Sequence, residues 1–563
     1  MREDQRLKNI EYMKKLIDII IILAKGGKPL RGHNEKEESC EKGLFLEIVQ
    51  LLKKYDRDFE SYINLAPKNC TYLSNYIQND ILLSIKNVIL RNIQNELSGQ
   101  PFSIIADETS DSTDAETIFG AINSTIQDLG ASWDNAIGVC FDGASTMSGQ
   151  SSGVQTRCKE MNASIMYVHC HAHCLNLSLV AACSNRLENP KILDFFGVIQ
   201  LIYNFIEGSP KRHAVFEDIV KLTDIKLKTL KSLSQTRWAC RAEAVAVIQV
   251  QLKAIIEAIE KVVSEATDPI IRAKGNGILN QIQSFDFIVG LEIMNPILQL
   301  VVKVSKTLQS PELDLCQAVE EISSLVLALQ ELRIDESIFD NIYSRIVNTL
   351  NDLKIQIPIP RKRKVPAKID SNPCNEYQFK SIKEETRKSE FYPVLDQLVQ
   401  STNEKFDQET KSVIYFMGKL LKLDLNFDQE RDAQSTTKKF GIDNDELRAE
   451  VRLLRTKKDT KSFPCTVIEW LNWLSIQNRK LCYPTFYKLV STFASIPVTS
   501  CTCERSFSKL SIIKSKLRST MLQDRLENLM VPFIEQDLAV NIDPIEVLEE
   551  FKKIVPFDRR MVL

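Results

Sequence analysis

The chain has 563 residues, which is too long for a single compact core, so its length predicts two to four domains or one fold interrupted by a large insertion. Its 72 Lys and Arg residues are balanced by 74 Asp and Glu residues, and the net charge of −2 excludes a global positive field for nucleic acid. Its 14 cysteines follow no evenly spaced framework and we see no signal peptide, so we expect reduced, intracellular thiols.

The N-terminal region, 1–97, is predicted to be helical because apolar residues recur every three or four positions, as in FLEIVQLLKKY at 45–55. The most apolar early run, 16–26, contains Asp18 and is shorter than the ~20 residues that a membrane helix needs. We interpret this run as a buried helix and expect no association with a membrane.

The next region, 98–185, contains short β-rich runs, FSIIA at 102–106, AIGVCF at 136–141 and IMYVHC at 165–170, and therefore predicts α/β structure. The first two runs are expected to be buried strands.

An amphipathic helix is predicted between those two strands. Thr113 and Glu116 match a capping box, and Gly130 supplies a C-terminal stop. Its apolar face is formed by Ile118, Ile122 and Ile126.

Each of the two strands is followed by an acid, Asp107 and Asp142 respectively. A strand, a crossover helix and a parallel strand place both C-terminal ends at one edge of a sheet. Two carboxylates at that edge favour a bound Mg²⁺ or Mn²⁺, and a third would complete a two-metal site. The alternative for both acids is a helix cap or a solvated turn, which is how we interpret Glu108, Asp111 and Asp114.

The region 186–480 is predicted to be a long helical segment, interrupted by a Pro-rich and basic linker at 355–373. Within the linker, PRKRKVP at 360–366 has the composition of a nuclear import signal, although basic loops without this role are common.

The last dense block, 481–540, precedes a short tail at 541–563. A helix is predicted in this block, capped by either Ser500 or Thr502, with an apolar face formed by Phe507, Leu510 and Ile513. The same segment carries a basic stripe that either contacts phosphate or is a solvated helix face: Arg505, Lys509, Lys514, Lys516 and Arg518.

Several motifs occur in an order that resembles the hAT superfamily of DNA transposases, in particular its domesticated and zinc finger MYM-type relatives. The motifs are IIADETSD, CFDGASTMSGQSSGVQ, YVHCHAHCLNLSLV, QTRW and SIPVTSCTCERSFSKLSIIKSKLRSTMLQDRLENLM, and the helical text at 27–56 is similar to the region preceding the catalytic core in those relatives. The final block resembles the hAT C-terminal dimerisation region.

The resemblance implies an α+β, predominantly helical fold: an RNase H-like core interrupted by a long α-helical insertion. It implies a catalytic and metal-binding triad of Asp107, Asp142 and Glu504 with Mg²⁺ or Mn²⁺ if the protein is active. The nucleic-acid-binding residues that it implies are Cys170 and His173 of a Cys-x-x-His motif, Arg237 and Trp238 of the TRW motif, and Arg505. The dimerisation residues are Ile513, Leu517, Leu526, Leu529 and Phe533.

Three of these assignments have structural alternatives. Core packing also explains the apolar spacing of the last block, and we expect some of this face to complete the core and some to meet a second subunit. Trp238 either stacks on a flipped base or is an ordinary core aromatic. The cluster from His169 to Cys174 suggests zinc, but a structural zinc site needs four ligands, usually in two separated pairs, and the chain has no C-x-x-C. We therefore expect no structural zinc and interpret the cluster as a packed, partly polar helix start.

The sequence departs from the family in two places. Two antiparallel strands are expected after the first catalytic strand, yet IIADETSD leads directly into a helix, so the core is predicted to be truncated with an exposed strand edge. Before residue 97, only His33, Cys40 and Cys70 could contribute to a DNA-binding zinc finger, which is too few. These departures suggest a truncated or alternatively spliced product of a transposase-derived gene.

The sequence thus predicts a hAT transposase-derived nuclear protein, a homodimer or heterodimer through its C-terminal region, with DNA as a candidate partner and without transposase activity. The first alternative is a metal-dependent DDE-type DNA strand transferase or nuclease. The second is a protein-interaction scaffold that binds no nucleic acid.

Overall fold

The computed structural model contains two compact units. Unit 1 comprises Met1–Ile137, Gly149–Ile165 and Ser500–Leu563, and unit 2 comprises Gly138–Ser148 and Met166–Thr499. Most of the chain is helical and strands are few, which confirms the predicted helical α+β class. The residues described are 2–563 except 33–41, 66–70, 108–113, 224–227, 234–237, 361–362, 365–375, 378, 407–409, 428–430, 459–462, 516–517, 519 and 558–559.

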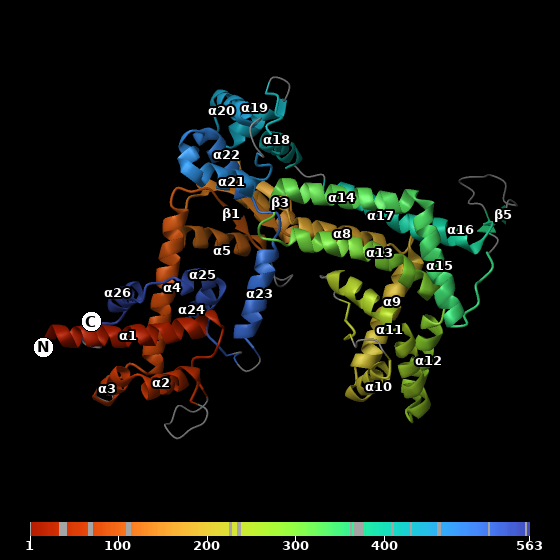
Figure 1. Cartoon of the computed structure of the whole chain (residues 1–563), viewed down its shortest axis with the longest axis horizontal. Helices are drawn as coiled ribbons and strands as arrows, with labels where there is room; N and C mark the ends of the chain where they lie inside the picture. The colour runs from red at the N-terminus through yellow and green to blue at the C-terminus, as the bar shows by residue number, and fades with distance from the viewer. Residues whose placement is uncertain are drawn as a thin grey trace. The chain divides into compact units, whose positions relative to one another are not determined.

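Unit 1 is built from the two ends of the chain. Its elements are α1 (Arg2–Lys25), α2 (Leu44–Tyr55), α3 (Arg57–Leu65), α4 (Asn75–Leu97), β1 (Phe102–Ile105), α5 (Ala115–Asp128), η2 (Trp133–Asn135), α7 (Val154–Met161), α23 (Cys501–Ile513), α24 (Gln523–Ile534), α25 (Gln536–Val540) and α26 (Pro544–Ile554). Figure 1 shows α1 crossing α4, with α24 and α25 beside them, and α4 packs against both α24 and α26. The N-terminal helices therefore depend on C-terminal helices for their packing.

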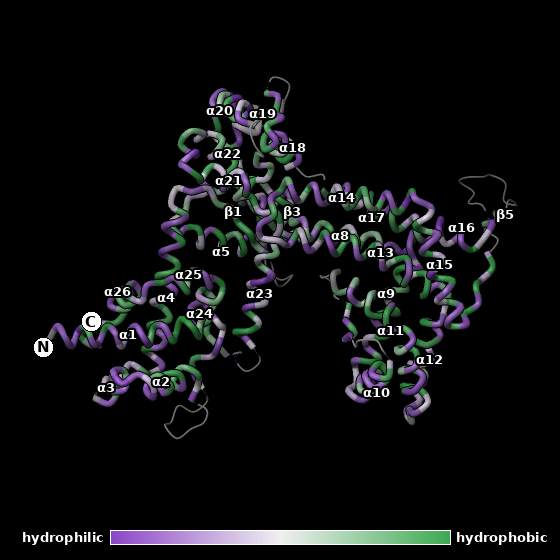
Figure 2. The backbone as a smooth tube through the Cα atoms, in the orientation of Figure 1, coloured by the Kyte–Doolittle hydropathy of each residue, from purple (hydrophilic) through white to green (hydrophobic). Residues whose placement is uncertain are grey.

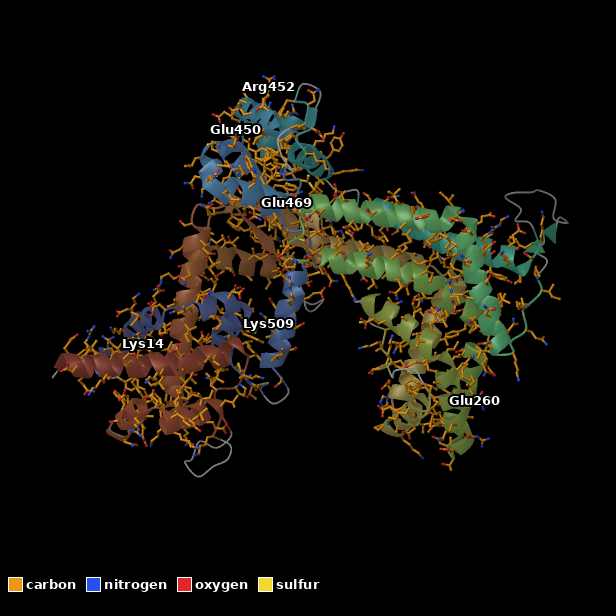
Figure 3. All side chains as sticks on the ribbon, viewed as in Figure 1. Lys14, Glu260, Glu450, Arg452, Glu469 and Lys509 are labelled. Carbon is orange, nitrogen blue, oxygen red and sulfur yellow. The ribbon has the colours of Figure 1, made fainter. Side chains whose placement is uncertain are left out.

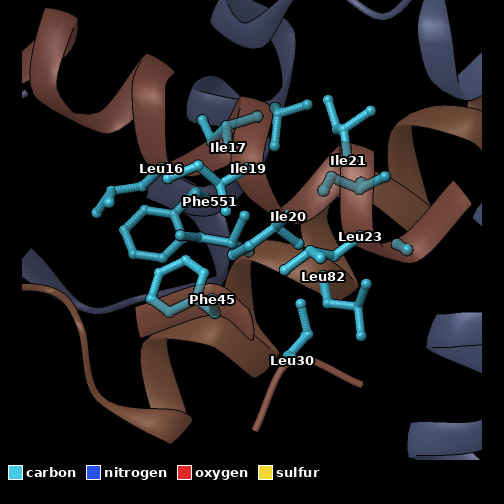
Figure 4. Packing of buried hydrophobic residues seen from close by; sticks show 14 of the residues in the cluster. Leu16, Ile17, Ile19, Ile20, Ile21, Leu23, Leu30, Phe45, Leu82 and Phe551 are labelled. Carbon is cyan, nitrogen blue, oxygen red and sulfur yellow. The ribbon is translucent and has the colours of Figure 1, made fainter. Parts of the chain in front are cut away.

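The core of unit 1 forms around α1, whose apolar residues point in almost every direction. Leu16, Ile17 and Ile20 are fully buried, and Figure 4 shows them beside Phe45 of α2 and Phe551 of α26. Each large apolar side chain buried in this way contributes roughly 1.5–3 kcal/mol. The prediction of a buried helix at 16–26 is confirmed.

Unit 2 carries the long helices of the middle of the chain. Its elements are most of β2 (Ala136–Phe141), α6 (Ser145–Ser148), β3 (Met166–His169), α8 (His171–Ser184), α9 (Pro190–Glu207), α10 (Pro210–Lys221), α11 (Trp238–Glu265), α12 (Pro269–Ile282), α13 (Phe285–Leu308), α14 (Leu315–Ile334), α15 (Glu336–Asp352), β4 (Arg363–Lys364), β5 (Glu376–Tyr377), α16 (Ile382–Thr386), η3 (Arg387–Phe391), α17 (Tyr392–Lys405), α18 (Lys411–Leu421), α19 (Arg431–Lys439), α20 (Asn444–Lys458), α21 (Val467–Ser475), η4 (Ile476–Leu481) and α22 (Pro484–Ala494). In Figure 1, α8, α13, α14 and α17 run side by side, and α17 packs on both α8 and α14.

Hydrophobic and hydrophilic residues alternate along the helices of each unit, as Figure 2 shows. Among the helices that the structure describes, α13 is long and apolar enough to cross a membrane. In unit 2, however, 72% of its most apolar 18-residue window is buried by neighbouring helices, which is typical of a core helix.

The later helices of unit 2 pack around Trp470, whose indole is buried and donates to the carbonyl oxygen of Leu421 at 2.9 Å. The carboxylate of Glu450 in α20 accepts hydrogen bonds from the amides of Thr485 and Phe486, at 3.1 and 2.7 Å, and so caps the N-terminus of α22. Figure 3 labels Glu450 and Glu469 in this group. Glu469 completes a capping box with Thr466 at the start of α21.

The strands form one three-stranded sheet in the order β1-β2-β3 and one small antiparallel pair, β4 and β5. Strands β2 and β3 are parallel, with Gly138 opposite Met166 and Phe141 opposite His169. Both apolar runs at 136–141 and 165–170 are thus strands, as predicted. Parallel pairing brings their C-terminal ends to one edge, where Asp142 and Cys170 follow.

Two details at the start of this region differ from prediction. Strand β1 is only half-buried along its whole length, so the expectation of a buried strand is wrong. The N-cap of α5 is Asp114, whose carboxylate accepts from the Thr117 amide at 2.7 Å, so the capping box of Thr113 and Glu116 is also wrong. Thr113, Glu108 and Asp111 lie outside the described residues.

Asp114 has the capping role predicted for it, and Gly130, at φ 62°, stops the helix as predicted.

Candidate functional site

The three acids of the predicted triad follow the elements on which they were expected. Asp107 comes two residues after the end of β1 and Glu504 lies in the first turn of α23, both in unit 1, whereas Asp142 comes directly after β2 in unit 2. All three side chains are half-buried. Their assignment as one catalytic, metal-binding site stays a prediction.

Among the residues that the structure describes, no group of three or more His, Cys, Asp or Glu side chains is arranged to hold a metal ion. The oxygen donors of the three acids suit Mg²⁺ or Mn²⁺ by their chemistry, and the Cys170 and His173 pair would suit zinc only with two further ligands. The assignment of Mg²⁺ or Mn²⁺ to the three acids stays a prediction, as does the expectation of no structural zinc.

The loop after β2 is held tightly around Asp142. Oδ1 of Asp142 accepts a hydrogen bond from the Ala144 amide at 3.2 Å. The carbonyl oxygen of Asp142 accepts one from the Tyr167 hydroxyl of β3 at 3.4 Å. Burial raises the pKa of Tyr167, so this hydroxyl stays protonated as a donor. A Cβ atom on Gly143 would lie 2.7 Å from Nε2 of His169, and glycine is therefore required here by space.

The Cys-x-x-His motif lies at the junction of β3 and α8. Cys170 is buried at the N-cap of α8, and its amide donates to the carbonyl oxygen of Phe141 at 2.9 Å, which extends the pairing of β3 with β2. His173 is half-buried, with its ring centroid 5.9 Å from that of His169. Burial lowers the pKa of His169 and the neighbouring His173 lowers it further, while Cys170 and Asp142 oppose this shift. Asp142, His169, Cys170 and His173 thus form one polar corner in unit 2.

The buried start of α8 agrees with a packed, partly polar helix start. His171 is almost completely buried, its amide donates to the carbonyl oxygen of Val498 at 3.1 Å, and its ring meets Phe406 edge-on at 5.2 Å. Burial lowers its pKa to about 4. His171 is therefore a neutral core residue at physiological pH.

The helix that carries Glu504, α23, begins as predicted, with Ser500 at its N-cap. The Ser500 side chain makes no capping hydrogen bond, and Thr502 lies within the helix. Arg505 is exposed, with Nη2 3.3 Å from the hydroxyl of Thr502. It is therefore accessible to a partner, as its predicted role in binding nucleic acid requires.

The basic stripe of this segment is divided between the fold and the surface. The Nζ of Lys509, labelled in Figure 3, donates to the carbonyl oxygens of Phe533 and Ile534, so Lys509 stabilises the end of α24. Arg518 donates to the carbonyl oxygen of Gly27. Lys514 is exposed, and Lys516 lies outside the described residues.

The TRW motif lies where α11 begins. Trp238 is the first residue of α11. Arg237 lies outside the described residues, as does the side chain of Trp238, so the predicted contact of both with nucleic acid stays a prediction.

Four of the predicted dimerisation residues belong to the core of unit 1. Ile513, Leu526, Leu529 and Phe533 are all buried in the cluster that contains α1 and α4. They complete the core of their own unit, and their assignment to a dimer contact stays a prediction. Leu517 lies outside the described residues.

Sequence reasoning missed Tyr167, Gly143 and the capping role of Lys509. The DGAS turn indicated the glycine only as a turn residue, because its need for space depends on where β3 places His169. Tyr167 was visible only as one residue of a β-rich run. The target of Lys509 lies 24 residues further along the chain, and no local pattern indicates it.

Two stretches of the chain match known protein families. Residues 445–538, which run from α20 to α25, match the hAT family C-terminal dimerisation region. Residues 1–118, from α1 to the start of α5, match a family described as ZMYM1/FAM200, RNase-like domain. The resemblance to hAT-derived proteins predicted from the sequence is confirmed by these matches.

Among individual proteins, the chain is similar to the 52 kDa repressor of the inhibitor of the protein kinase. The mouse (Mus musculus) protein is 20% identical over 95% of this chain and 76% of its own length. The human (Homo sapiens) protein is 21% identical over 95% of this chain and 75% of its own length. The likeness therefore extends through both units.

Proposed function

We propose that this chain is a hAT transposase-derived nuclear protein that dimerises through its C-terminal region and binds DNA without transposing it. The observation that carries the proposal is the match of residues 445–538 to the hAT dimerisation region. The similarity to a repressor along 95% of the chain supports a domesticated role.

The dimer contact is proposed to use exposed apolar side chains within the matched region, since its buried ones already fill the core of unit 1. Leu453, Ile476 and Leu481 are exposed in unit 2, and Ile512 and Leu522 are exposed in unit 1. Burying exposed apolar side chains of this size between two chains would remove apolar surface from water and so favour association.

The absence of transposition is supported by the space available after β1. Strand β1 ends at Ile105 and α5 begins at Ala115, so only residues 106–114 connect them. Two further antiparallel strands with their turns need more chain than this, because a strand is typically 5–6 residues long. The core that would carry a transposase site is therefore shortened beside Asp107. The relatives are named for repression of an inhibitor, which agrees with a role other than transposition.

Nuclear localisation and DNA binding are supported by local basic residues, not by net charge. The segment 360–366 carries four consecutive basic residues, of which Arg363 and Lys364 form β4. Arg505 adds an exposed guanidinium on α23. A DNA complex that uses such residues should weaken steeply as salt rises.

A second candidate is a metal-dependent DDE-type nuclease or strand transferase, which is favoured by the retention of Asp107, Asp142 and Glu504 at element ends. In that case the three carboxylates would hold Mg²⁺ or Mn²⁺, which would supply charge stabilisation for phosphoryl transfer.

One experiment separates the two candidates. The full chain is incubated with a labelled DNA duplex in Mg²⁺ or Mn²⁺, and both binding and cleavage are measured. We expect a salt-sensitive complex and no cleavage. Cleavage that is lost in Asp142→Asn would establish the enzyme and overturn the proposal, and the absence of any complex at low salt would overturn its DNA-binding part.

A further inference from the structure

A groove runs between helices α14 and α17 of unit 2. The two helices pack side by side, as Figure 1 shows, and the groove between them has a volume of about 420 Å³. Two residues of α14 and six of α17 line this space, which we name the α14–α17 groove: Gln330, Arg333, Leu395, Asp396, Val399, Gln400, Asn403 and Glu404. All of them lie outside the region 445–538 that matches the dimerisation family.

The α14–α17 groove is open to solvent along its length. Five of its eight lining residues are exposed, and Leu395 is fully buried at its base. The lining residues of α17 run from Leu395 to Glu404, which is roughly 14 Å, or two to three turns of helix. A small molecule is usually enclosed by its site, so an open groove of this length favours an elongated ligand.

Two exposed apolar side chains border the groove on α14. Leu327 and Ile334 are 65% and 77% exposed. They lie three residues before and four residues after Gln330, which lines the groove, so the three side chains share one face of the helix. A ligand that lies along the groove and covers Leu327 and Ile334 would remove their apolar surface from water.

The single arginine among the lining residues is already neutralised by a carboxylate. Nε of Arg333 lies 2.9 Å from Oδ1 of Asp396, and its guanidinium carbon lies 3.5 Å from the centroid of the Tyr392 ring. The ion pair and the cation–π contact hold the guanidinium in place. Arg333 and Asp396 together therefore add no net charge to the groove.

Two carboxylates near this ion pair are not matched by cations. Glu404 lines the groove and accepts from the side-chain amide of Gln400 at 2.9 Å. Glu331 is exposed on α14, next to Gln330. Within the part of the chain that the structure describes, neither Glu404 nor Glu331 is in an ion pair. The groove is therefore negative, and its charge is complementary to a basic ligand.

We propose that the α14–α17 groove binds an amphipathic helix of a partner protein, with apolar residues facing Leu327 and Ile334 and with Lys or Arg beside Glu404. A helix that lies in a groove uses apolar anchors about one turn apart, and two to three turns match the length of this groove. The basic flank of the partner helix supplies the cations that Glu404 and Glu331 lack. This binding goes beyond the proposed function, because it requires neither DNA nor dimerisation.

The probe is a synthetic amphipathic peptide of about 14 residues, with Leu along one face of the helix, Lys on both flanks and Ala elsewhere. A matched peptide has Glu in place of every Lys. The affinity of both peptides for the full chain is measured by fluorescence anisotropy. The natural chain is expected to bind the Lys peptide about tenfold more tightly than the Glu peptide, because like charges oppose the Glu peptide.

The apolar border is tested with Leu327→Gln and Ile334→Gln, which leave the net charge unchanged. Each is expected to weaken binding of the Lys peptide at least about fivefold. The matched control is Leu222→Gln, which changes a side chain that is 87% exposed at the end of α10 and should not alter binding. Thermal melting confirms that each variant is folded.

The charge of the groove is tested with Glu404→Lys. This variant should bind the Lys peptide about threefold more weakly and the Glu peptide about threefold more tightly than the natural chain does. The control is Glu257→Lys, which makes the same change in net charge at an exposed position of α11 and should leave both affinities unchanged.

The proposal is overturned if the natural chain does not prefer the Lys peptide or binds neither peptide. It is also overturned if folded Leu327→Gln binds as Leu222→Gln does, or if Glu404→Lys binds as Glu257→Lys does. Sedimentation of the same variants tests a second copy of the chain as the occupant. Loss of self-association in Leu327→Gln with unchanged peptide binding would assign this face to a second copy and overturn the proposal.

Discussion

Lys509 of α23 caps the last turn of α24 by donating from Nζ to the carbonyl oxygen of Phe533 at 2.8 Å, and the same ammonium lies 5.3 Å from the centroid of the Phe533 ring. A second bond, to the carbonyl oxygen of Ile534, is 3.2 Å long. A cation at a helix C-terminus is favoured by the helix dipole as well as by these bonds. This contact joins two helices of the region that matches the hAT dimerisation family.

Lys509→Met is expected to destabilise unit 1 by about 1–2 kcal/mol, since it removes a charged hydrogen bond and the cation–π contact but retains the alkyl chain. The matched control is Lys514→Met, which removes an exposed lysine from the end of the same helix. Urea unfolding measures the stability of both variants. Equal unfolding midpoints for the two variants would show that the cap does not stabilise the unit.

Gly143→Ala is expected to destabilise unit 2 by about 1–3 kcal/mol, because the new Cβ would lie 2.7 Å from Nε2 and 2.8 Å from Cε1 of His169. Gly197→Ala in α9 is the control, since a Cβ there meets no atom within 4 Å and alanine favours a helix. Thermal melting should move in opposite directions for the two variants. A Gly143→Ala protein as stable as the natural chain would contradict the described packing of this loop.

Stability is expected to fall between about pH 6.5 and pH 4 because of His171. Its folded pKa of about 4 lies below the usual value of 6.5, so the unfolded chain binds a proton that the folded chain excludes. The contribution of neutral His171 is complete above pH 6.5 and is lost as pH falls towards 4, to a limit of roughly 3 kcal/mol.

His171→Leu removes the imidazole that takes up this proton, so the stability of the variant should depend less on pH than that of the natural chain. The informative quantity is the difference in unfolding free energy between the natural chain and the variant at pH 7 and at pH 4.5. Relative to the variant, the natural chain should lose stability at the lower pH. A difference that is the same at both pH values would exclude a depressed pKa for His171.

Substitutions in the C-terminal region should separate core residues from interface residues. Leu529→Ala is expected to destabilise unit 1 by about 2–5 kcal/mol, because Leu529 is 1% exposed within its core. Leu481→Glu changes a side chain that is 74% exposed and should leave the melting temperature of the monomer unchanged while weakening self-association. Thermal melting reports the stability of each variant and sedimentation reports its self-association, so the two together separate a core residue from an interface residue. If Leu529→Ala weakened association without loss of stability, the core placement of Leu529 would be contradicted.

Periodicity and strand propensity were sufficient for the elements of the fold. The apolar run at 16–26 predicted a buried helix, and AIGVCF and IMYVHC predicted strands, because residue spacing within one element is local information. The half-burial of β1 was not predictable from FSIIA, since burial depends on which strands flank it. Asp114 replaced Thr113 as the N-cap because both residue types can cap, and the choice depends on where the helix is packed.

The elements that carry the candidate site residues were predictable from the sequence, but the surroundings of those residues were not. The ends of β2 and β3 placed Asp142 and Cys170 at one edge, as strand order requires. The apolar spacing of Leu526, Leu529 and Phe533 is the same for a core face and for an interface, so sequence alone could not assign these residues to the core of unit 1.

The central claim is that the chain dimerises through the region 445–538. The most direct measurement is the molar mass of the full chain in solution by light scattering at micromolar concentrations, together with that of Leu481→Glu and Leu522→Glu. The account predicts twice the mass of one chain for the natural protein and a shift towards a single chain when both substitutions are combined. A single-chain mass for the natural protein throughout that range would contradict it.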